Sequence, residues 1–298
     1  MKIEFKVENN LSGISIKQYL INNLNMSKRL IIKLKKNQNI LCNKIPVYVN
    51  YIMKTNDIIT INLEFNEENN IVPFDSNLNI LYEDESFLIV DKPANLPTHP
   101  SAYHYDNTLS NIVRNYYMKN NIDTLIRPVN RLDKNTSGIV VFAKNQYVQE
   151  QLIEQMKQNI FKKEYICIIN GHLKKESGII NLPIAREKES IIKRCISDDG
   201  DTAITEYTVI KRFYINDISM SLVKVNLLTG RTHQIRVHFS HIGYHLIGDS
   251  LYGTESDLID RQALHCVKLS FIHPITKKEL IINSDIPKDI QNILKAGN

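Results

Sequence analysis

One acidic side chain, Asp133, stands in a basic stretch of the sequence, RPVNRLDKNTSGIVVFAKN, at residues 127–145. Neighbouring cations favour the ionised form of a carboxylate, which can act as a nucleophile or stabilise developing positive charge. Gly138 and the apolar run IVVFA follow, so Asp133 is predicted to lie in a loop just before a buried strand. The alternative is that Asp133 only caps the turn through residues 134–136. The basic neighbours are Arg127, Arg131, Lys134 and Lys144.

Two arginines lie in a second segment, LLTGRTHQIRVHFSHIGYHLIGDSLYG, at residues 227–253. Gly230 is predicted to end a strand and Thr232 to cap a helix. Arg236 then falls in the first turns of that helix, and Arg231 precedes it. A guanidinium can bind a phosphate or a carboxylate through two parallel hydrogen bonds, so the segment predicts a cationic site for one of these groups.

The same segment is rich in histidine. A zinc site formed by His238, His241 and His245, with Asp249 beyond them, is an alternative, because imidazoles and a carboxylate can hold a catalytic metal. The helix is expected to end near Gly243, which would turn His245 away from the other two. Structural or RNA-facing histidines, His233 among them, are therefore the favoured interpretation, and no metal site is predicted.

A third segment, KKEYICIINGH at residues 162–172, reads as an alternating strand that opens with Lys163 and Tyr165. Tyr165 is either an ordinary core residue or a ring on which a nucleic-acid base stacks. Such a stacking contact contributes roughly 1–3 kcal/mol.

The elements that would position these residues are mostly strands. Helices are predicted at 106–118 and 145–157, and the two strands around residues 84–86 form a predicted hairpin. Several antiparallel strands with few helices indicate an α+β fold with a mixed, mainly antiparallel sheet and flanking helices. The predicted strands are ILYED, FLIVDKP, GIVVFAK, KEYICIING, TAITEYTVI and SLVKVNLLTG.

The N-terminal residues form a separate basic segment. Residues 1–62 hold ten lysines and arginines against three acids, a net charge of +7, so the remaining residues carry −2 of the total +5. Two short helices followed by small strands indicate a compact ααβ module, with Ser27 as N-cap of the second helix. We expect it to bind a polyanion; the alternative is a solvated basic helix with no partner. Its candidate contacts are Lys28, Arg29, Lys33, Lys35 and Lys36.

Residues 63–77 are acidic, Asn-rich and interrupted by proline, which predicts a linker. Three parts are therefore expected: a basic domain at 1–62, a linker at 63–77 and a catalytic domain at 78–298.

Other classes of protein have no support in the sequence. There is no signal peptide, no apolar run of membrane-spanning length and no glycine-rich nucleotide-binding motif, and the four cysteines are scattered. We therefore expect a cytoplasmic protein with reduced thiols and no membrane association.

Two resemblances give these patterns a common meaning. SKRLIIKLKKNQNILCNKIPV, followed by TNDIITI, resembles the alpha-L RNA-binding motif, although polar residues replace the glycines usual before the central strand and after Asn43. RPVNRLDKNTSGIVVFAKN, KKEYICIING and LLTGRTHQIRVH together resemble the RluA-type pseudouridine synthase family, which isomerises uridine to pseudouridine in RNA. VDKPANLPTHPS, IGDSLYG and RQALHCVKLSFIHP fit its remaining landmarks in order, over residues 78–290.

The family resemblance implies a role for each matching residue. Asp133 would be the essential catalytic residue, Arg236 its ionic partner and Tyr165 the ring that stacks on the target base. Arg131 would help to occupy the gap left by the extruded uridine. The reaction would need no cofactor. Asn130 stands where the family usually has histidine, and we expect it to alter loop hydrogen bonding or RNA fit without abolishing activity.

RNA is thus the expected partner, and the enzyme is expected to be a monomer. Ribosomal RNA of the large subunit is the favoured substrate and transfer RNA the alternative. Two rival functions are a non-catalytic RNA-binding or ribosome-assembly protein on the same fold, and a nucleoside hydrolase that uses an aspartate. Free uracil would be a product only of the hydrolase.

Overall fold

The main sheet is built around two adjacent strands whose sequences are almost wholly apolar. In β8 (Ser137–Ala143) every side chain is buried, and in β6 (Phe87–Lys92) all but one is buried. Buried strands of this kind read as continuous apolar runs because both faces of the sheet are covered. The computed structural model describes residues 1–65, 67–101 and 105–297.

Strand order in this sheet brings the three chemically interesting segments together. Within the described residues the order is β10-β13-β14-β9-β15-β8-β6-β5, with β16 paired to β15 and β7 to β8. All of these pairings are antiparallel except that of β15 with β8, so the predicted α+β fold with a mixed, mainly antiparallel sheet is confirmed. The remaining strands are β5 (Ile80–Glu83), β7 (Arg127–Pro128), β9 (Lys162–Asn170), β10 (Ser177–Asn181), β13 (Ile204–Ile215), β14 (Ile218–Leu227), β15 (Leu264–Ile272) and β16 (Glu279–Asn283).

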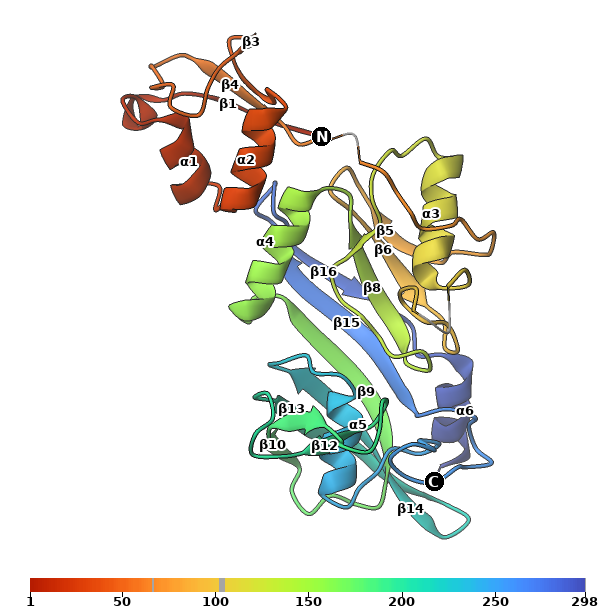
Figure 1. Ribbon diagram of the computed structural model, residues 1–298. Coiled ribbons are helices and arrows are strands. Elements are labelled where there is room, and N and C mark those ends of the chain that lie inside the picture. Colours follow the sequence, from red (N-terminus) through yellow and green to blue (C-terminus); the bar gives the residue numbers. More distant parts are fainter. Residues whose placement is uncertain (66, 102–104, 298) are drawn as a thin grey trace.

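Helices formed by the described residues flank the strands of the body (Figure 1). They are α3 (Leu109–Lys119), α4 (Gln146–Lys157), α5 (Gln234–His241) and α6 (Lys288–Ala296). A small hairpin of β11 (Ile184–Arg186) and β12 (Arg194–Ile196) lies beside α5. None of the helices in the described residues has the length and apolar character that crossing a membrane would require.

The N-terminal part forms its own four-stranded sheet, in the order β1-β4-β2-β3. Ser27 caps α2 by accepting a hydrogen bond from Leu30 N at 3.1 Å, as predicted. Gln38 and Lys44, at φ +53° and +70°, take the left-handed backbone in which glycine is usual. The elements are β1 (Lys2–Lys6), α1 (Ile16–Asn22), α2 (Lys28–Lys36), β2 (Ile40–Cys42), β3 (Ile45–Pro46) and β4 (Ile58–Asn62), with a 3₁₀ turn at Asn9–Leu11.

Polar contacts join the N-terminal part to the body. Ser27 Oγ donates to Glu150 Oε1 on α4 at 2.9 Å, and Gln151 Nε2 donates to the carbonyl of Asn25 at 3.1 Å. Glu67, in the segment predicted to be a linker, pairs with both Lys33 of α2 and Arg127 of β7. One carboxylate thus ties the basic helix to the strand that leads into the Asp133 loop.

Several elements were not predicted from the sequence. β1 escaped notice because KIEFK is half exposed, and the short edge strands β10 and β16 each bury only one residue. β15 is more instructive, since LHCVKLSFI pairs with β9 and β8 and so lies at the centre of the sheet. Its polar residues His265 and Ser270 hide the apolar run that marks a central strand.

Gly138 is required where β8 passes β15. Its φ is +117°, and a Cβ there would lie 2.3 Å from the carbonyl oxygen of Cys266. Gly138→Ala should therefore destabilise the protein by roughly 3 kcal/mol, through backbone strain and a clash with main-chain atoms. Gly243→Ala is the control, because Gly243 also has a positive φ but its Cβ would meet open space. It should cost roughly 1 kcal/mol. Thermal unfolding measures both, and equal shifts in Tm would contradict this account.

Candidate active site

The loop that carries Asp133 is held by a buried lysine and a buried threonine. The Lys92 ammonium is fully buried and donates to the carbonyls of Pro93, Leu96 and Lys134 at 2.8–3.0 Å. Thr98 Oγ1 donates to Leu132 O at 2.8 Å and accepts from Leu132 N at 3.2 Å. Bonds on both sides of Asp133 therefore hold the loop in one position.

Asn130 adds a third anchor to the same loop. Its amide nitrogen donates to Ile139 O and its amide oxygen accepts from Val141 N, both at 2.9 Å. The side chain is buried and replaces a pair of main-chain ladder bonds along β8. This loop-fixing role is consistent with the expectation that Asn130 affects loop hydrogen bonding.

The Asp133 carboxylate is free of the turn that follows it. A main-chain bond from Thr136 N to Asp133 O, at 3.1 Å, closes that turn. Two of the basic neighbours are also engaged elsewhere, because Arg127 pairs with Glu67 and Lys144 with Glu83. The prediction that the local basic stretch supplies the cations around Asp133 was thus wrong for these two residues.

The cation beside Asp133 is Arg236, as the sequence analysis expected. Arg236 Nη1 lies 3.3 Å from Asp133 Oδ2, and its Nε and Nη2 each lie 2.7 Å from a carboxylate oxygen of Asp249. Burial by itself lowers the pKa of Arg236, but the hydrogen bonds and negative charge of Asp249, together with Asp133, raise the pKa overall. The guanidinium is thus a permanent cation aimed by one carboxylate at another.

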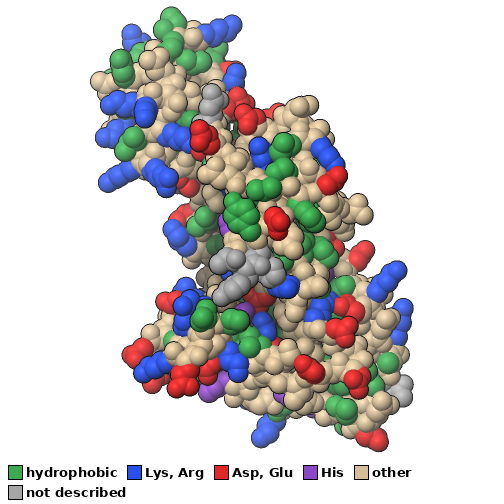
Figure 2. Space-filling model, turned by 45° about the vertical axis from the view of Figure 1, so that its right-hand side comes forward, with side chains coloured by type: hydrophobic (Ala, Val, Ile, Leu, Met, Phe, Trp, Pro, Cys, Tyr) green, Lys and Arg blue, Asp and Glu red, His purple; other side chains and the backbone are tan. Residues whose placement is uncertain are grey.

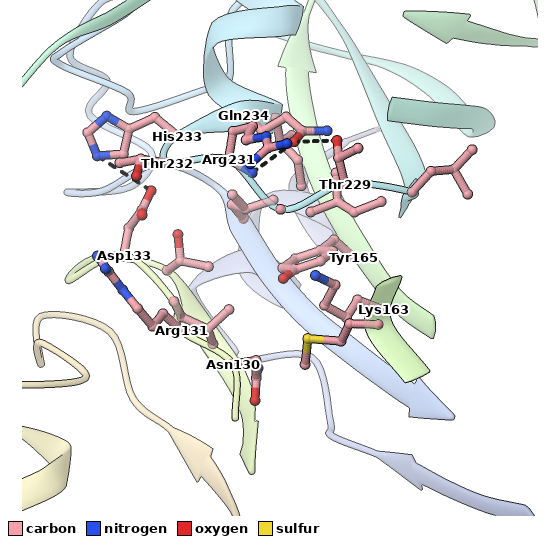
Figure 3. A pocket seen from close by; sticks show the side chains of 18 of the residues that line it. Asn130, Arg131, Asp133, Lys163, Tyr165, Thr229, Arg231, Thr232, His233 and Gln234 are labelled. Atoms are coloured by element: carbon pink, nitrogen blue, oxygen red, sulfur yellow. Dashed lines mark hydrogen bonds and ion pairs between the residues drawn. The ribbon is translucent and has the colours of Figure 1, made fainter. Parts of the chain in front are cut away.

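A second nitrogen faces the same oxygen of Asp133. His233 Nε2 lies 3.8 Å from Asp133 Oδ2, and Figure 3 shows the ring facing the carboxylate. His233, not Thr232, is the N-cap residue of α5, with φ +58°. Burial lowers the pKa of His233, with Asp133 opposing and Arg236 reinforcing that shift. The imidazole is therefore predominantly neutral near pH 7.

The turn that presents His233 is organised by Gln234. Its Oε1 accepts from Thr229 Oγ1 at 2.8 Å and from Arg231 N at 3.0 Å. Its Nε2 donates to Ile204 O and Thr205 Oγ1, both at 3.0 Å. This buried amide connects the end of β14 and the start of α5 to β13. These bonds hold the turn in which His233 has a left-handed backbone conformation.

Asp133 faces Tyr165 and Lys163 across a cavity of about 600 Å³ (Figure 3). Tyr165 is only 5% exposed, and burial raises the pKa of its phenol well above 10, so the ring stays neutral. Burial also lowers the pKa of Lys163. Arg131 lies exposed at the rim. The cavity has the size of a small-molecule or nucleotide pocket, with one carboxylate, nearby cations and an aromatic wall.

The histidines considered as an alternative zinc site have separate hydrogen-bond partners. His238 is buried, and both ring nitrogens contact protein atoms at 2.9 Å, Nδ1 with Thr205 Oγ1 and Nε2 with Leu182 O. His245 follows the end of α5 and lies near Thr254. In residues 1–65, 67–101 and 105–297, no group of three potential metal ligands comes together.

The predicted RNA-binding residues lie on α2. Lys28, Arg29, Lys35 and Lys36 are exposed, and Figure 2 shows Lys and Arg side chains gathered on the N-terminal part. Lys33 differs, because it pairs with Glu67 and its ammonium lies 4.1 Å from the centre of the Phe65 ring. Lys33 is therefore engaged in joining α2 to the following segment.

The sequence does not reveal the contacts that Asp249, His233 and Lys92 make at this site. Asp249 and Lys92 stand in two segments that the sequence analysis had noted as landmarks, IGDSLYG and VDKPANLPTHPS. A lone aspartate after a glycine gives no sign that it will bind an arginine thirteen residues earlier. The density of histidines around His233 suggested a function but not which ring reaches Asp133.

Comparison with known proteins agrees with this architecture. The family profile described as RNA pseudouridylate synthase matches residues 86–241. The chain is 38% identical over 273 residues to the "uncharacterized RNA pseudouridine synthase YhcT" of Bacillus subtilis, covering 92% of this chain and 90% of the relative. It is 34% identical to ribosomal large subunit pseudouridine synthase D of Escherichia coli K12, covering 80% of this chain and 76% of that protein.

A solved structure shares the fold. Human RNA pseudouridylate synthase domain containing 1 superposes with a TM-score of 0.59 at 26% sequence identity, covering 70% of this chain and 83% of that one.

Asp249 should matter more for stability than any surface aspartate. Asp249→Asn removes the charge that faces the buried Arg236 and weakens the bonds to Leu251 N and Tyr252 N. We expect a loss of about 3 kcal/mol in the free energy of unfolding, typical of a buried ion pair that loses one partner. The exposed Asp260→Asn should change it by less than about 0.5 kcal/mol. Urea unfolding tests both, and similar midpoints would refute the role of Asp249.

Proposed function

This chain belongs to the RNA pseudouridylate synthase family, and from that premise we propose that it converts specific uridines of structured RNA to pseudouridine. The proposed substrate is large-subunit ribosomal RNA, and the proposed essential catalytic residue is Asp133. The pairing of Asp133 with the buried Arg236, opposite Tyr165 in a nucleotide-sized cavity, is the observation that carries the proposal.

The chemistry matches what these residues can supply. The bond between uracil N1 and ribose C1′ breaks, the uracil turns, and its C5 bonds to C1′. C5 then loses its proton, and N1 gains one. No electrons are gained or lost, so the isomerisation needs no redox partner. Asp133 would either attack C1′ or remove a ribose proton, and an ionised carboxylate serves both routes.

Arg236 holds the carboxylate in position through the contact of its Nη1 with Asp133 Oδ2 at 3.3 Å. Its bonds to Asp249 fix the guanidinium independently of substrate, so no reorganisation is needed when the nucleotide arrives. Asp133 Oδ2 faces both Arg236 and His233, which leaves Oδ1 as the oxygen for the sugar.

The target base must leave its stack to reach Asp133. Extrusion costs a few kcal/mol in a duplex and least in a loop, which favours looped RNA as substrate. Tyr165 would stack on the extruded uracil, and Arg131 at the rim would occupy the gap in the RNA. The exposed cations of α2 would hold the phosphate backbone.

Large-subunit ribosomal RNA is proposed because the Escherichia coli relative is named for it and because the basic N-terminal part suits an extended RNA surface. Mapping pseudouridines in total RNA with and without the gene tests this choice. If deleting the gene removed pseudouridine only from transfer RNA, transfer RNA would be the substrate. Release of free uracil would indicate hydrolysis instead.

Asp133→Asn should bind RNA but form no pseudouridine, with a rate loss on the order of 10³-fold or more. The substitution keeps the size of the side chain, and Asp249 still holds Arg236, so the fold should survive. Pseudouridine is measured by mass spectrometry of digested RNA, with the exposed Asp257→Asn as the control. Wild-type activity in Asp133→Asn would disprove the assignment.

Replacing Lys28, Arg29, Lys35 and Lys36 by glutamine should weaken RNA binding and flatten its salt dependence. If all four neutralise phosphates, the slope of log affinity against log salt should fall by roughly 3. The control replaces four exposed lysines elsewhere, Lys174, Lys175, Lys277 and Lys278. An equal change of slope in both variants would mean that α2 has no special part in binding.

A further inference from the structure

The Tyr252 hydroxyl connects the β11–β12 hairpin to the residue that faces Asp133. Arg194 N, on β12, donates to Tyr252 Oη at 2.7 Å, and Tyr252 Oη lies 2.9 Å from His233 Nδ1. The Tyr252 ring also lies against the Arg236 guanidinium, 5.0 Å from its carbon to the ring centre. One tyrosine thus contacts the hairpin and both nitrogen-bearing partners of Asp133.

The hydrogen bonds at Arg194 and at Asp133 determine the direction in which each group between them donates its proton. Because the Arg194 N–H donates to Tyr252 Oη, the tyrosine proton is free to donate to His233 Nδ1. The proton of the neutral imidazole is then on Nε2, where it points at the Asp133 carboxylate. The opposite tautomer would leave the tyrosine proton without a partner and turn a nitrogen lone pair toward a negative charge.

The hairpin at the other end carries two arginines. Arg186 and Arg194 are directly opposite each other in the register of β11 and β12. Like charges in this position repel, and an anion between them relieves the repulsion. The two arginines line, together with Asp199 and Asp201, a groove of about 520 Å³ that shares residues 230–232 with the cavity at Asp133. RNA that follows the groove would meet the hairpin and the catalytic carboxylate together.

We propose that His233 and Tyr252 are positioning residues that link the β11–β12 hairpin to the catalytic carboxylate: Tyr252 holds His233 in the Nε2–H tautomer, and His233 donates to Asp133 Oδ2. This inference rests on the proposed role of Asp133. At 3.8 Å the donor is just beyond bonding distance, so a small movement on RNA binding completes the contact.

The charged and titratable groups that face His233 come from several elements. They are Asp133 from its loop, Arg236 on α5, Arg194 on β12, and Asp249 and Tyr252 from the segment after α5. Burial lowers the pKa of His233, whereas burial raises the pKa of Tyr252, so the neutral pair persists near pH 7. At lower pH a second proton on Nδ1 displaces the tyrosine donor, so kcat should fall on the acid side of the profile.

The first test needs no activity. Nitrogen NMR of the full-length protein with ¹⁵N-labelled histidine reports which ring nitrogen carries the proton, and His233→Gln identifies the signal. We expect a single Nε2–H tautomer in the wild type and a mixture in Tyr252→Phe. An Nδ1–H tautomer in the wild type would overturn the proposal. Because no RNA is present, this result stands apart from the proposed function.

The second test is a double-mutant cycle on kcat with an RNA that the wild type modifies. Tyr252→Phe should lower kcat about tenfold with little change in KM, the loss expected from one misplaced hydrogen bond to a charged group. His233→Gln keeps an N–H donor near the Nε2 position but has no tautomers, so it should retain most activity and lose the acid-side fall. Tyr252→Phe should then change kcat less than twofold in the His233→Gln background.

Tyr244→Phe is the matched control, since it removes a hydroxyl from a partly buried tyrosine outside the site, and it should leave kcat unchanged. An equal loss from Tyr252→Phe in both His233 backgrounds would mean that Tyr252 does not act through His233, and would overturn the link. A wild type that makes no pseudouridine in any RNA would instead refute the proposed function.

Discussion

The site depends on a buried arginine held between two carboxylates. Arg236 is 7% exposed, and an uncompensated guanidinium in that position would be very costly. Asp249 compensates it with two bonds of 2.7 Å, while Asp133 takes the remaining nitrogen at 3.3 Å. The closer pair gives the cation its place in the fold, and the looser pair leaves Asp133 free for the catalytic role proposed for it.

This arrangement explains why so much of the surrounding structure is rigid. A carboxylate is useful in catalysis only if its position is set before the substrate arrives. Lys92, Thr98 and Asn130 hold the Asp133 loop to the strands from which it emerges, while Gln234 holds the turn that leads into α5. These side-chain bonds therefore keep the Asp133 loop and the start of α5 facing each other, although no strand or helix connects the two directly.

The proposed RNA-binding cations and the proposed catalytic site lie on separate parts that remain connected. The exposed cations lie on α2, and Glu67 joins that helix to Arg127, six residues before Asp133. An acidic segment that was expected to be a plain linker thus makes specific contacts with both the basic helix and the body. Its composition indicated a lack of regular structure, which is what residues 63–65 and 67–77 have, but composition could not reveal its partners.

Local patterns in the sequence determined the strands with unbroken or alternating apolar residues and the helix capped by Ser27. The family resemblance, rather than local pattern, made Asp133, Tyr165 and Arg236 candidates for one site. Local patterns did not predict β15, which is a central strand because it pairs with β8 and β9. Only the tertiary structure decided which charges meet: Arg127 and Lys144, close to Asp133 in sequence, pair elsewhere, and Arg236, 103 residues away, takes their place. The reason is physical, because periodicity arises from the backbone, whereas an ion pair depends on distances of a few ångströms that only the packing of distant elements sets.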